Sequence, residues 1–409
     1  MKALFVLRHN NDFDSMTSVV DGWVRLSDHH RAIVYVTSSD LKWRGDYRTA
    51  MLEETGRVTF FDFWTVAGLG NGGYLAEHWQ TNKPDERVSR RILHVATELR
   101  VAPGFSSKMT KFIDELSPDI IAFDSIRIRP RRKLFDFFGY QEILAWSKKN
   151  ARPLVSLPHG LLLFSFEEKN KKDWTNYDAI FVESDRKKEI FSDGVADKVI
   201  VSGSPRYDPS WVKRIADRLA ADTPEPSAKR DKVNMVFFAT KEAKYFRFPD
   251  LLAWLAHLAS HPDVELVVQP HPRGQRESAF SSIANLPNVR IDPYTPASSL
   301  IGEADIVSTL VSSVVVEAIV RKQEILYPKF LSAAETQFDE VGACIALSSM
   351  EQTHPAIDKY QAGNRVARKN YDEFLRRFVY GNGDPQVIKR ICDKMDMLAA
   401  GKHRSGNDS

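Results

Sequence analysis

The stretch that decides the fold runs from Val264 to Ala318 and holds two short apolar segments, each ending in polar residues. The first reads Val-Glu-Leu-Val-Val-Gln-Pro-His-Pro-Arg from Val264 to Arg273. The second reads Ala-Asp-Ile-Val-Ser-Thr-Leu-Val-Ser-Ser-Val-Val-Val-Glu-Ala from Ala304 to Ala318. Short runs rich in β-branched residues are typical of parallel strands that are buried on both faces. They predict an open α/β sheet, in which ligands bind beyond the carboxyl ends of the strands.

Polar side chains at the ends of both segments predict a site for an anion. His271 and Arg273 end the first segment, and Ser312 and Ser313 precede a predicted helix that carries Glu317. A helix start offers free backbone N–H groups and the positive end of its dipole to a phosphate. We therefore expect a phosphate or pyrophosphate between His271 and the Ser312-Ser313 turn, with Glu317 on a ribose hydroxyl. Taken singly, a His-Pro turn and a serine N-cap are the alternative interpretations.

The His-Pro element, the Ser-Ser element and the following Glu-Ala resemble the nucleotide-binding half of bacterial GT-B-fold transferases. The resemblance is to CDP-glycerol glycerophosphotransferases and to CMP-sialic acid and CMP-Kdo transferases. Non-hydrolysing UDP-N-acetylglucosamine 2-epimerases are similar too, although less so at the Ser-Ser element. The resemblance covers most of residues 150–395 in the order of elements, and it implies a nucleotide-activated donor in the C-terminal domain.

Length and composition favour a globular protein of two domains. The chain has 409 residues, a hydrophobic share of 43%, a charged share of 27% and a net charge of +3, which gives no reason to expect a nucleic acid partner. It has no apolar run of the ~20 residues that cross a bilayer, and Met1 leads directly into an apolar segment, so we expect a cytoplasmic location. Cys344 and Cys392 are far apart, which argues against a disulfide framework or a thiolate metal site.

The basic residues are unevenly distributed. They gather in two runs, made of Arg127, Arg129, Arg131, Arg132 and Lys133, and of Lys169, Lys171 and Lys172. A solvated surface is the ordinary interpretation of such runs. The alternative is peripheral contact with an anionic glycan, a lipid-linked acceptor or the inner membrane face.

A polar loop follows the first predicted strand, Lys2 to Leu7. It contains Arg8, His9, Asp12 and Asp14, and it lacks the glycine-rich fingerprint of a dinucleotide site. These residues are therefore candidates for the acceptor side or for catalysis. Asp12 and Asp14 match an Asp-x-Asp metal motif, which we interpret as coincidence, so we expect no metal ion. Asp14 is also a possible helix N-cap.

His159 is the first candidate for a catalytic base. The predicted strand ending at Leu157 is followed by Pro158-His159-Gly160, where the glycine permits a tight turn that projects the imidazole into an interdomain cleft. An imidazole has a pKa near ~6.5 and can accept a proton at neutral pH. The CDP-glycerol transferases use a comparable His-Gly, so the resemblance implies the same role here. A buried, hydrogen-bonded histidine is the alternative, and Asp14 is the second candidate base.

Two further segments are expected to contact the donor. The Gly-Ser-Pro-Arg-Tyr-Asp stretch from Gly203 to Asp208 resembles a Gly-x-Pro-Arg-x-Asp element at the domain crossover of the same family, and the Arg206 guanidinium suits a phosphate. The predicted strand Val233–Ala239 ends at Thr240 and Lys241, which we expect to touch the donor phosphates.

The predicted architecture is α/β, with two Rossmann-like domains facing a cleft in the GT-B arrangement. Residues 1–208 form the acceptor-side domain, residues 209–385 the donor-binding domain, and residues 386–409 a helix that crosses back, with a tail.

The predicted function is transfer of a sugar or polyol phosphate from a nucleotide-activated donor, cytidine-activated by resemblance. The acceptor is a hydroxyl of a cell-surface polysaccharide, such as capsule or lipopolysaccharide, or of a lipid-linked molecule. We expect no cofactor. One alternative is a sugar-nucleotide enzyme similar to UDP-N-acetylglucosamine 2-epimerase, and another is a non-catalytic nucleotide-sugar-binding protein on the same fold.

Overall fold

The computed structural model divides the chain into two compact units, each described by itself. The first unit comprises Met1–Gly160, Glu168–Arg206 and Gln386–Ser409, and the second comprises Leu161–Glu167 and Tyr207–Pro385. The structure describes all residues except 8–9, 38–41, 69–103, 125–138, 162–173, 190, 192, 222–231, 241–245, 272–276, 382 and 406–409. Both basic runs, and the predicted site residues Arg8, His9, Lys241 and Arg273, lie outside the described residues.

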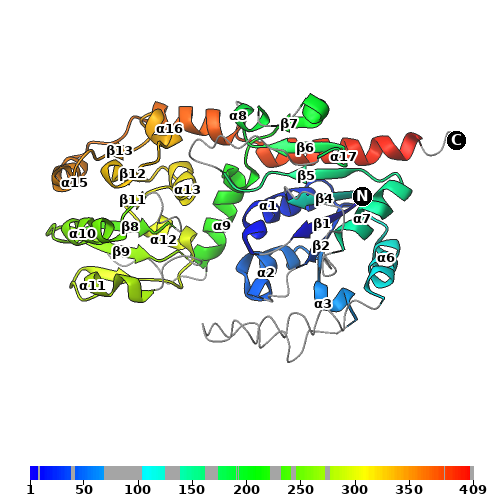
Figure 1. Cartoon of the computed structure of the whole chain (residues 1–409), viewed down its shortest axis with the longest axis horizontal. Coiled ribbons are helices and arrows are strands. Elements are labelled where there is room, and N and C mark those ends of the chain that lie inside the picture. The colour runs from blue at the N-terminus through cyan, green and yellow to red at the C-terminus, as the bar shows by residue number, and fades with distance from the viewer. Residues whose placement is uncertain are drawn as a thin grey trace. The chain divides into compact units, whose positions relative to one another are not determined.

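The first unit is built on a sheet of seven parallel strands in the order β3-β2-β1-β4-β5-β6-β7 (Figure 1). The strands are β1 (Lys2–Leu7), β2 (Arg31–Val36), β3 (Val58–Asp62), β4 (Ile120–Asp124), β5 (Leu154–Leu157), β6 (Ala179–Val182) and β7 (Val199–Val201). The central strand β1 has the predicted bounds, and its side chains from Ala3 to Leu7 are fully buried. Continuous apolar sequence is what a strand covered on both faces requires.

Helices cover this first sheet, and several of them begin shortly after a strand ends. The described α-helices are α1 (Asn10–Leu26), α2 (Tyr47–Glu53), α3 (Phe63–Val66), α6 (Phe105–Leu116), α7 (Tyr140–Lys149), α8 (Asp185–Lys188) and α17 (Val387–Ser405). Short 3-10 turns lie at Lys42–Gly45, Asp193–Lys198 and Pro205–Tyr207. The core between helices and sheet is aromatic, with Trp64, Phe105 and Phe123 fully buried.

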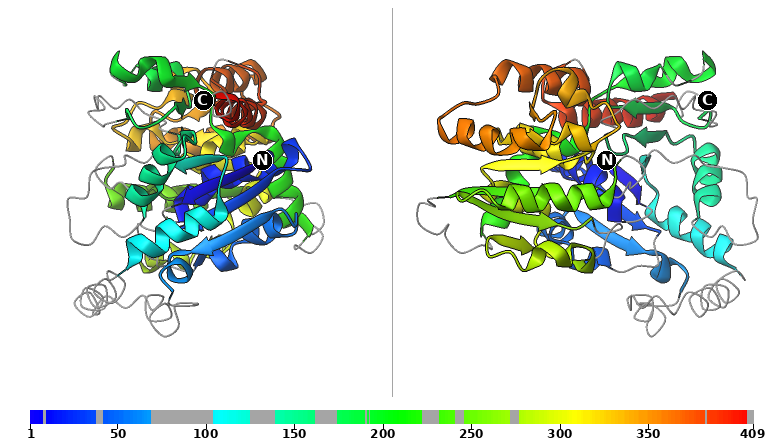
Figure 2. Two further views of the ribbon diagram at one scale, coloured as in Figure 1. Left: turned by 90° about the vertical axis from the view of Figure 1, so that its right-hand side faces the viewer. Right: turned by 60° about the vertical axis from the view of Figure 1, so that its left-hand side comes forward.

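The second unit repeats the arrangement with six parallel strands in the order β10-β9-β8-β11-β12-β13. Strands of this sheet appear as green to yellow arrows in the right-hand view of Figure 2. The strands are β8 (Val233–Phe238), β9 (Val264–Gln269), β10 (Val289–Ile291), β11 (Ile306–Thr309), β12 (Glu324–Tyr327) and β13 (Ile345–Ala346). Its helices are α9 (Pro209–Ala221), α10 (Phe248–Ala259), α11 (Ser281–Ala284), α12 (Ala297–Glu303), α13 (Val314–Val320), α14 (Gln337–Glu340), α15 (Thr353–Gln361) and α16 (Arg368–Phe374). Short 3-10 turns lie at Glu277–Phe280, Lys329–Leu331 and Met350–Gln352, and a π-helical turn lies at Leu375–Val379. The two segments that opened the sequence analysis are β9 and β11, as predicted.

The last helix, α17, returns to the first unit after the chain has passed through the second, as predicted. It packs on α1, where a Cβ added at Gly22 would overlap Ile388. The glycine therefore lets the two helices approach closely. The Arg390 guanidinium donates to the Ser202 carbonyl at 2.8 Å and fixes α17 beyond β7.

Helix α1 places its first turn directly after β1. Its buried apolar side chains are Phe13, Met16, Val19, Val20, Trp23 and Val24, a spacing of three and four residues that turns one helix face to the sheet. Among the helices that the structure describes, none combines the length and apolar composition needed to cross a bilayer.

Candidate functional site

The carboxyl edge of the first sheet gathers an acid–imidazole cluster, made of Asp12, Asp124 and His159. Asp124 is the last residue of β4 and pairs in register with Leu157 of β5, two residues before His159. Asp12 lies in the first turn of α1, which follows β1, and β1 is the other neighbour of β4. Because parallel strands end at the same edge, three segments far apart in the sequence meet at one place.

The three side chains are in close polar contact. The distance from His159 Nδ1 to Asp124 Oδ2 is 2.6 Å, and that to Asp12 Oδ1 is 3.9 Å. Both aspartate side chains are 0% exposed, whereas the His159 side chain is 40% exposed. The imidazole is therefore the part of the cluster that a bound molecule can reach.

Gly160 explains how the chain turns after His159. Its φ is +53°, a left-handed conformation that costs little only for glycine. Its backbone N–H donates to the Ser15 hydroxyl at 3.4 Å, which ties this turn to the start of α1. The prediction that Gly160 permits a tight turn after β5 is confirmed.

The pKa of Asp124 is raised to about 6. Burial is the largest cause, the hydrogen bond from His159 opposes it, and the nearby Asp12 carboxylate adds to the rise. When His159 Nδ1–H donates to Asp124, the other ring nitrogen, Nε2, is left as the basic atom. The cluster can thus hold a proton near neutral pH and exchange it through an exposed imidazole.

Glu183 is an acidic residue of the same edge that the sequence analysis did not single out. It directly follows β6 and is buried. Burial raises its pKa, Lys187 and His159 lower it, and Asp124 raises it. An acid at the end of an apolar strand was the available signal, in Ala-Ile-Phe-Val-Glu.

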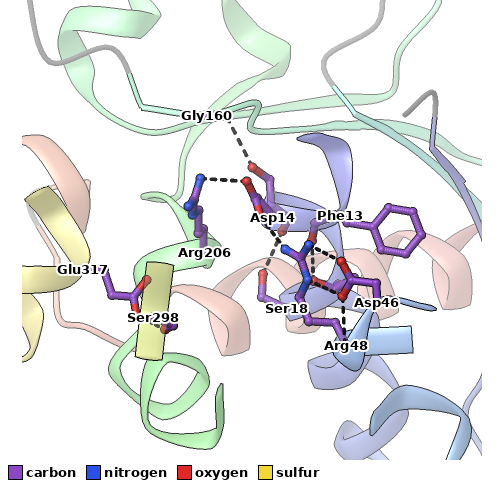
Figure 3. Close-up of polar contacts among 11 residues, drawn as sticks. Phe13, Asp14, Ser18, Asp46, Arg48, Gly160, Arg206, Ser298 and Glu317 are labelled. Atoms are coloured by element: carbon purple, nitrogen blue, oxygen red, sulfur yellow. Dashed lines mark hydrogen bonds and ion pairs between the residues drawn. The ribbon is translucent and has the colours of Figure 1, made fainter. Parts of the chain in front are cut away.

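Asp14 has different surroundings, although it lies only two residues from Asp12. Figure 3 shows it between Arg48 and Arg206, which both form ion pairs with its carboxylate, and Arg206 does so at 3.1 Å. Arg48 also binds Asp46 at 2.6 Å. We call Asp14, Asp46, Arg48 and Arg206 the arginine flank. Burial alone raises the pKa of Asp14, but Arg206 and Arg48 outweigh it and lower that pKa. The flank thus keeps Asp14 ionised.

In the second unit, the predicted donor residues lie at the carboxyl edge of the second sheet. Thr240 follows β8 and is buried, and His271 follows β9 and is half-buried. Ser312 lies after β11, so β8 separates the strands that lead to His271 and to Ser312. At about 4.8 Å per strand, those two strands are about 10 Å apart. The predicted phosphate site between them stays a prediction.

The turn before α13 is held by its own contacts. The Ser313 carbonyl accepts a hydrogen bond from the Tyr207 hydroxyl at 2.9 Å. Ser313 is the N-cap residue by position, but its side chain makes no capping hydrogen bond. The Ser312 hydroxyl accepts from the Val314 N–H at 3.4 Å. Of the two serines, Ser312 thus makes a long hydrogen bond to the backbone at the start of α13, and the Ser313 side chain makes none.

Glu317 lies in the first turn of α13 and is largely buried. It accepts a hydrogen bond from the Ser298 hydroxyl (Figure 3), and Arg321 approaches it at 3.5 Å. These contacts fix the carboxylate on the helix surface. Its predicted contact with a ribose hydroxyl stays a prediction.

No family model matches the chain, and no curated protein matches it. Solved structures are similar along nearly the whole length. The UDP-GlcNAc 2-epimerase from Methanocaldococcus jannaschii has 13% identity and a TM-score of 0.58 over 97% of this chain and 99% of its own. The UDP-GlcNAc 2-epimerase from Neisseria meningitidis, bound to UDP-GlcNAc, has 13% identity and a TM-score of 0.57 over 98% and 100%. The calicheamicin glycosyltransferase CalG4 has 11% identity and a TM-score of 0.51 over 98% of each chain.

These similarities confirm the predicted two-domain GT-B fold and correct the predicted function. A transferase that uses a cytidine-activated donor is not supported, because the similar structures include several UDP-GlcNAc 2-epimerases, one of them with UDP-GlcNAc bound. The resemblance to CDP-glycerol and sialyl transferases was thus right in fold and wrong in function. The alternative, a sugar-nucleotide enzyme of the epimerase kind, agrees better with the similar structures. The chain has the two-sheet fold that UDP-GlcNAc 2-epimerases and GT-B glycosyltransferases share.

Proposed function

We propose that the protein is a nucleotide-sugar enzyme that inverts the configuration at C2 of the sugar in a UDP-N-acetylhexosamine. Two lines of support come together. The solved structures that resemble the chain include a UDP-GlcNAc 2-epimerase bound to UDP-GlcNAc and the S. aureus protein MnaA bound to UDP. At 12 to 13% identity they establish the fold, and the acid–imidazole cluster supplies the chemistry that the reaction needs.

Inversion at C2 requires a proton to leave this carbon and another to arrive on the opposite face. The C2 proton has no neighbouring carbonyl group to acidify it, so its removal needs a base and a place for the electron pair. We propose that the C2–H bond breaks, a C1–C2 double bond forms, and the C1–O bond breaks as UDP leaves with the electron pair. UDP then re-forms the C1–O bond on the face from which it left, and a proton adds to the opposite face of C2, which gives the C2 epimer.

His159 is the residue that we assign to the proton transfer. Among Asp12, Asp124 and His159, it alone has an exposed side chain, so it alone meets the sugar. Asp124 orients the ring at 2.6 Å and stabilises the imidazolium ion when the proton has been taken. Asp124 and Asp12 are thus positioning residues that act through the imidazole. A single exposed base implies that the unsaturated sugar presents its two faces to His159 in turn.

The nucleotide is proposed to bind at the carboxyl edge of the second sheet. Thr240, His271 and Ser312 follow strands β8, β9 and β11, where α/β folds bind phosphates. We keep these residues, together with Ser313, Lys241 and Arg273, as proposed contacts of the diphosphate, and Glu317 as the proposed contact of the ribose. Arg206 is proposed to position Asp14 and, through it, the start of α1.

The observation that carries the proposal is the Asp124–His159 pair, since a buried carboxylate holding an exposed imidazole is a proton-transfer device. The test is incubation of the protein with UDP-GlcNAc in deuterium oxide, followed by proton NMR. We expect loss of the C2 proton signal and appearance of the C2 epimer, with no acceptor added. Release of nucleotide only when a glycan acceptor is present, with the C2 proton retained, would contradict the proposal.

A further inference from the structure

The acid–imidazole cluster has the donor atoms of a metal site. The Asp12 and Asp124 oxygens and a His159 nitrogen all lie within 4.8 Å of one another. Ligands of one divalent transition ion lie at about 2.0–2.2 Å from it, which places them about 3.0–3.5 Å apart. The distances from His159 Nδ1 to Asp124 and to Asp12, 2.6 Å and 3.9 Å, lie about half an ångström on either side of that range. Small side-chain shifts therefore suffice to place the ring between the two carboxylates as ligands of one ion.

Charge at the cluster favours a cation. Asp12 and Asp124 are both fully buried beside one imidazole, and the two carboxylates, once deprotonated, neutralise the charge of one divalent ion. The other imidazole–carboxylate pairs that the structure describes are arranged differently. His30 approaches Asp396 at 3.1 Å and His261 approaches Asp358 at 3.1 Å, and in both pairs the aspartate is partly exposed. The cluster thus differs from these pairs in holding two buried carboxylates against one ring.

We propose that Asp12, Asp124 and His159 bind one divalent transition-metal ion, and that an ion bound there blocks the proton transfer assigned to His159. Two oxygens and one imidazole nitrogen suit Zn²⁺ or Mn²⁺ better than Mg²⁺, which prefers oxygen ligands. The ion takes His159 Nδ1 and both carboxylates, and the neutral ring then carries its proton on Nε2, so Nε2 can no longer accept the C2 proton and metal binding excludes proton transfer. The first half of the proposal stands on the geometry alone, and the second half rests on the proposed function. It replaces the expectation that no metal ion binds.

Binding is tested on the full chain, freed of metal by a chelator and titrated with Zn²⁺ by calorimetry and with Mn²⁺ by electron paramagnetic resonance. We expect one ion per chain, with Mg²⁺ binding at least about 100-fold more weakly than Zn²⁺. D12N and H159Q should each weaken Zn²⁺ binding by about 100-fold or more, because removal even of a supporting partner costs 10-fold to 100-fold. D358N is the matched control, since it removes the carboxylate of an imidazole pair with no second buried acid, and it should bind Zn²⁺ as the unaltered protein does.

Several results would overturn the metal site. Zn²⁺ binding that is unchanged in D12N or H159Q places the ion elsewhere, and equal affinity for Mg²⁺ reduces the effect to attraction by negative charge. Circular dichroism shows whether each variant is folded, and H159Q is the variant least able to disturb folding because its ring is partly exposed. Calorimetry in two buffers adds a second readout, since ligands that lose protons on metal binding make the measured heat depend on the buffer.

The two halves of the proposal can fail separately. Zn²⁺ at one equivalent should abolish deuterium exchange at C2, and a chelator should restore it. A chain that binds Zn²⁺ at the cluster yet shows no exchange when metal-free retains the metal site and loses the proposed function. Full exchange with Zn²⁺ bound at the cluster overturns the second half.

Discussion

Asp12 and Asp14 lie two residues apart near the start of α1 and have different environments. Asp12 is fully buried and faces the imidazole of His159, whereas Asp14 is 34% exposed in its side chain and lies between two arginines. Residues two apart on a helix point in directions about 200° apart, since the helix turns once in 3.6 residues. The comparison teaches that one short segment contributes to two different regions. Asp12 belongs to the acid–imidazole cluster, which can hold a proton, and Asp14 belongs to the arginine flank, in which its charge is paired.

The largest difference between the two regions should appear in the rate of exchange at C2 when one aspartate of each region is replaced. We expect D124N to lower the rate of exchange at C2 by about 100-fold or more, because an amide in place of the carboxylate no longer fixes the tautomer of His159, a loss that costs up to about 10⁴ in comparable imidazole–carboxylate pairs. D14N should lower it by less than about 10-fold, since Asp14 forms ion pairs with Arg48 and Arg206 and acts on His159 only through its charge. Rates from NMR on both variants, with unchanged circular dichroism, make the measurement. Equal losses of exchange rate in D124N and D14N would show that the two regions act as one site.

The arginine flank should be revealed more by stability than by activity. R48M leaves Asp14 and Asp46 without the guanidinium that pairs with both, and the Arg48 side chain is 12% exposed. We expect the free energy of unfolding to fall by about 2 kcal/mol, below the 3–5 kcal/mol of fully buried pairs because the acids are partly solvated. Urea unfolding measures it. R376M, which removes an exposed pair with Glu373, is the control and should cost less than about 0.5 kcal/mol.

The turn after β5 gives a smaller effect that sharpens the assignment of His159. G160A forces a non-glycine residue into a φ of +53°, while a Cβ there would meet no other atom within 4 Å. The cost is therefore backbone strain of about 1 to 2 kcal/mol, together with a displaced imidazole and slower exchange. G194A is the control, because its Cβ also meets nothing and its φ is ordinary. If G194A lost as much stability as G160A, the positive φ of Gly160 would not explain the loss.

Acid should produce the smallest and most gradual effect, through histidines outside both regions. Burial lowers the pKa of His257, and so does the neighbouring His354, which stacks on it at 4.3 Å, while Glu351 and the Met350 backbone raise it. Burial also lowers the pKa of His30, with the chain's amino terminus acting in the same direction and Trp23 and Asp396 opposing it.

These two histidines therefore bind more protons in the unfolded chain than in the folded chain between their lowered pKa values and about pH 6.5, so their contribution to stability rises with pH there. Asp124, whose pKa is raised to about 6, contributes with the opposite sign below that pH, so the difference between the unaltered protein and H257Q isolates the histidine contribution. The stabilisation is present above about pH 6.5 and is lost as the pH falls through the lowered pKa values. Unfolding in urea at several pH values from 7.5 to 5 should show this slope, and H257Q should flatten it. A slope that H257Q leaves unchanged would assign the acid sensitivity to other groups.

Much of the fold was open to prediction because parallel strands have a plain signature. The runs at Lys2–Leu7, Val264–Gln269 and Ile306–Thr309 are apolar and β-branched, and each is a strand in the structure. His159 was equally visible, because a histidine and a glycine directly after such a run predict a turn at the sheet edge.

The partners of His159 were harder to predict, because they depend on strand order. Nothing in the sequence says that β4 lies between β1 and β5, and only this order brings Asp124 against His159 and Asp12. Glu183 was missed for the same reason. Asp12 and Asp14 could not be told apart either, since the helix faces they occupy depend on where α1 begins. The prediction of a cytidine-activated donor was wrong because short motifs at strand ends indicate a phosphate-binding fold and carry no information about the nucleotide base.

The most direct test of the central claim is the fate of the C2 proton of UDP-GlcNAc in deuterium oxide, measured by NMR with the metal-free protein. The account predicts deuterium at C2 and formation of the epimer without any acceptor, and loss of both in H159Q. Retention of the C2 proton by the unaltered protein, under conditions in which UDP-GlcNAc is bound, would contradict it.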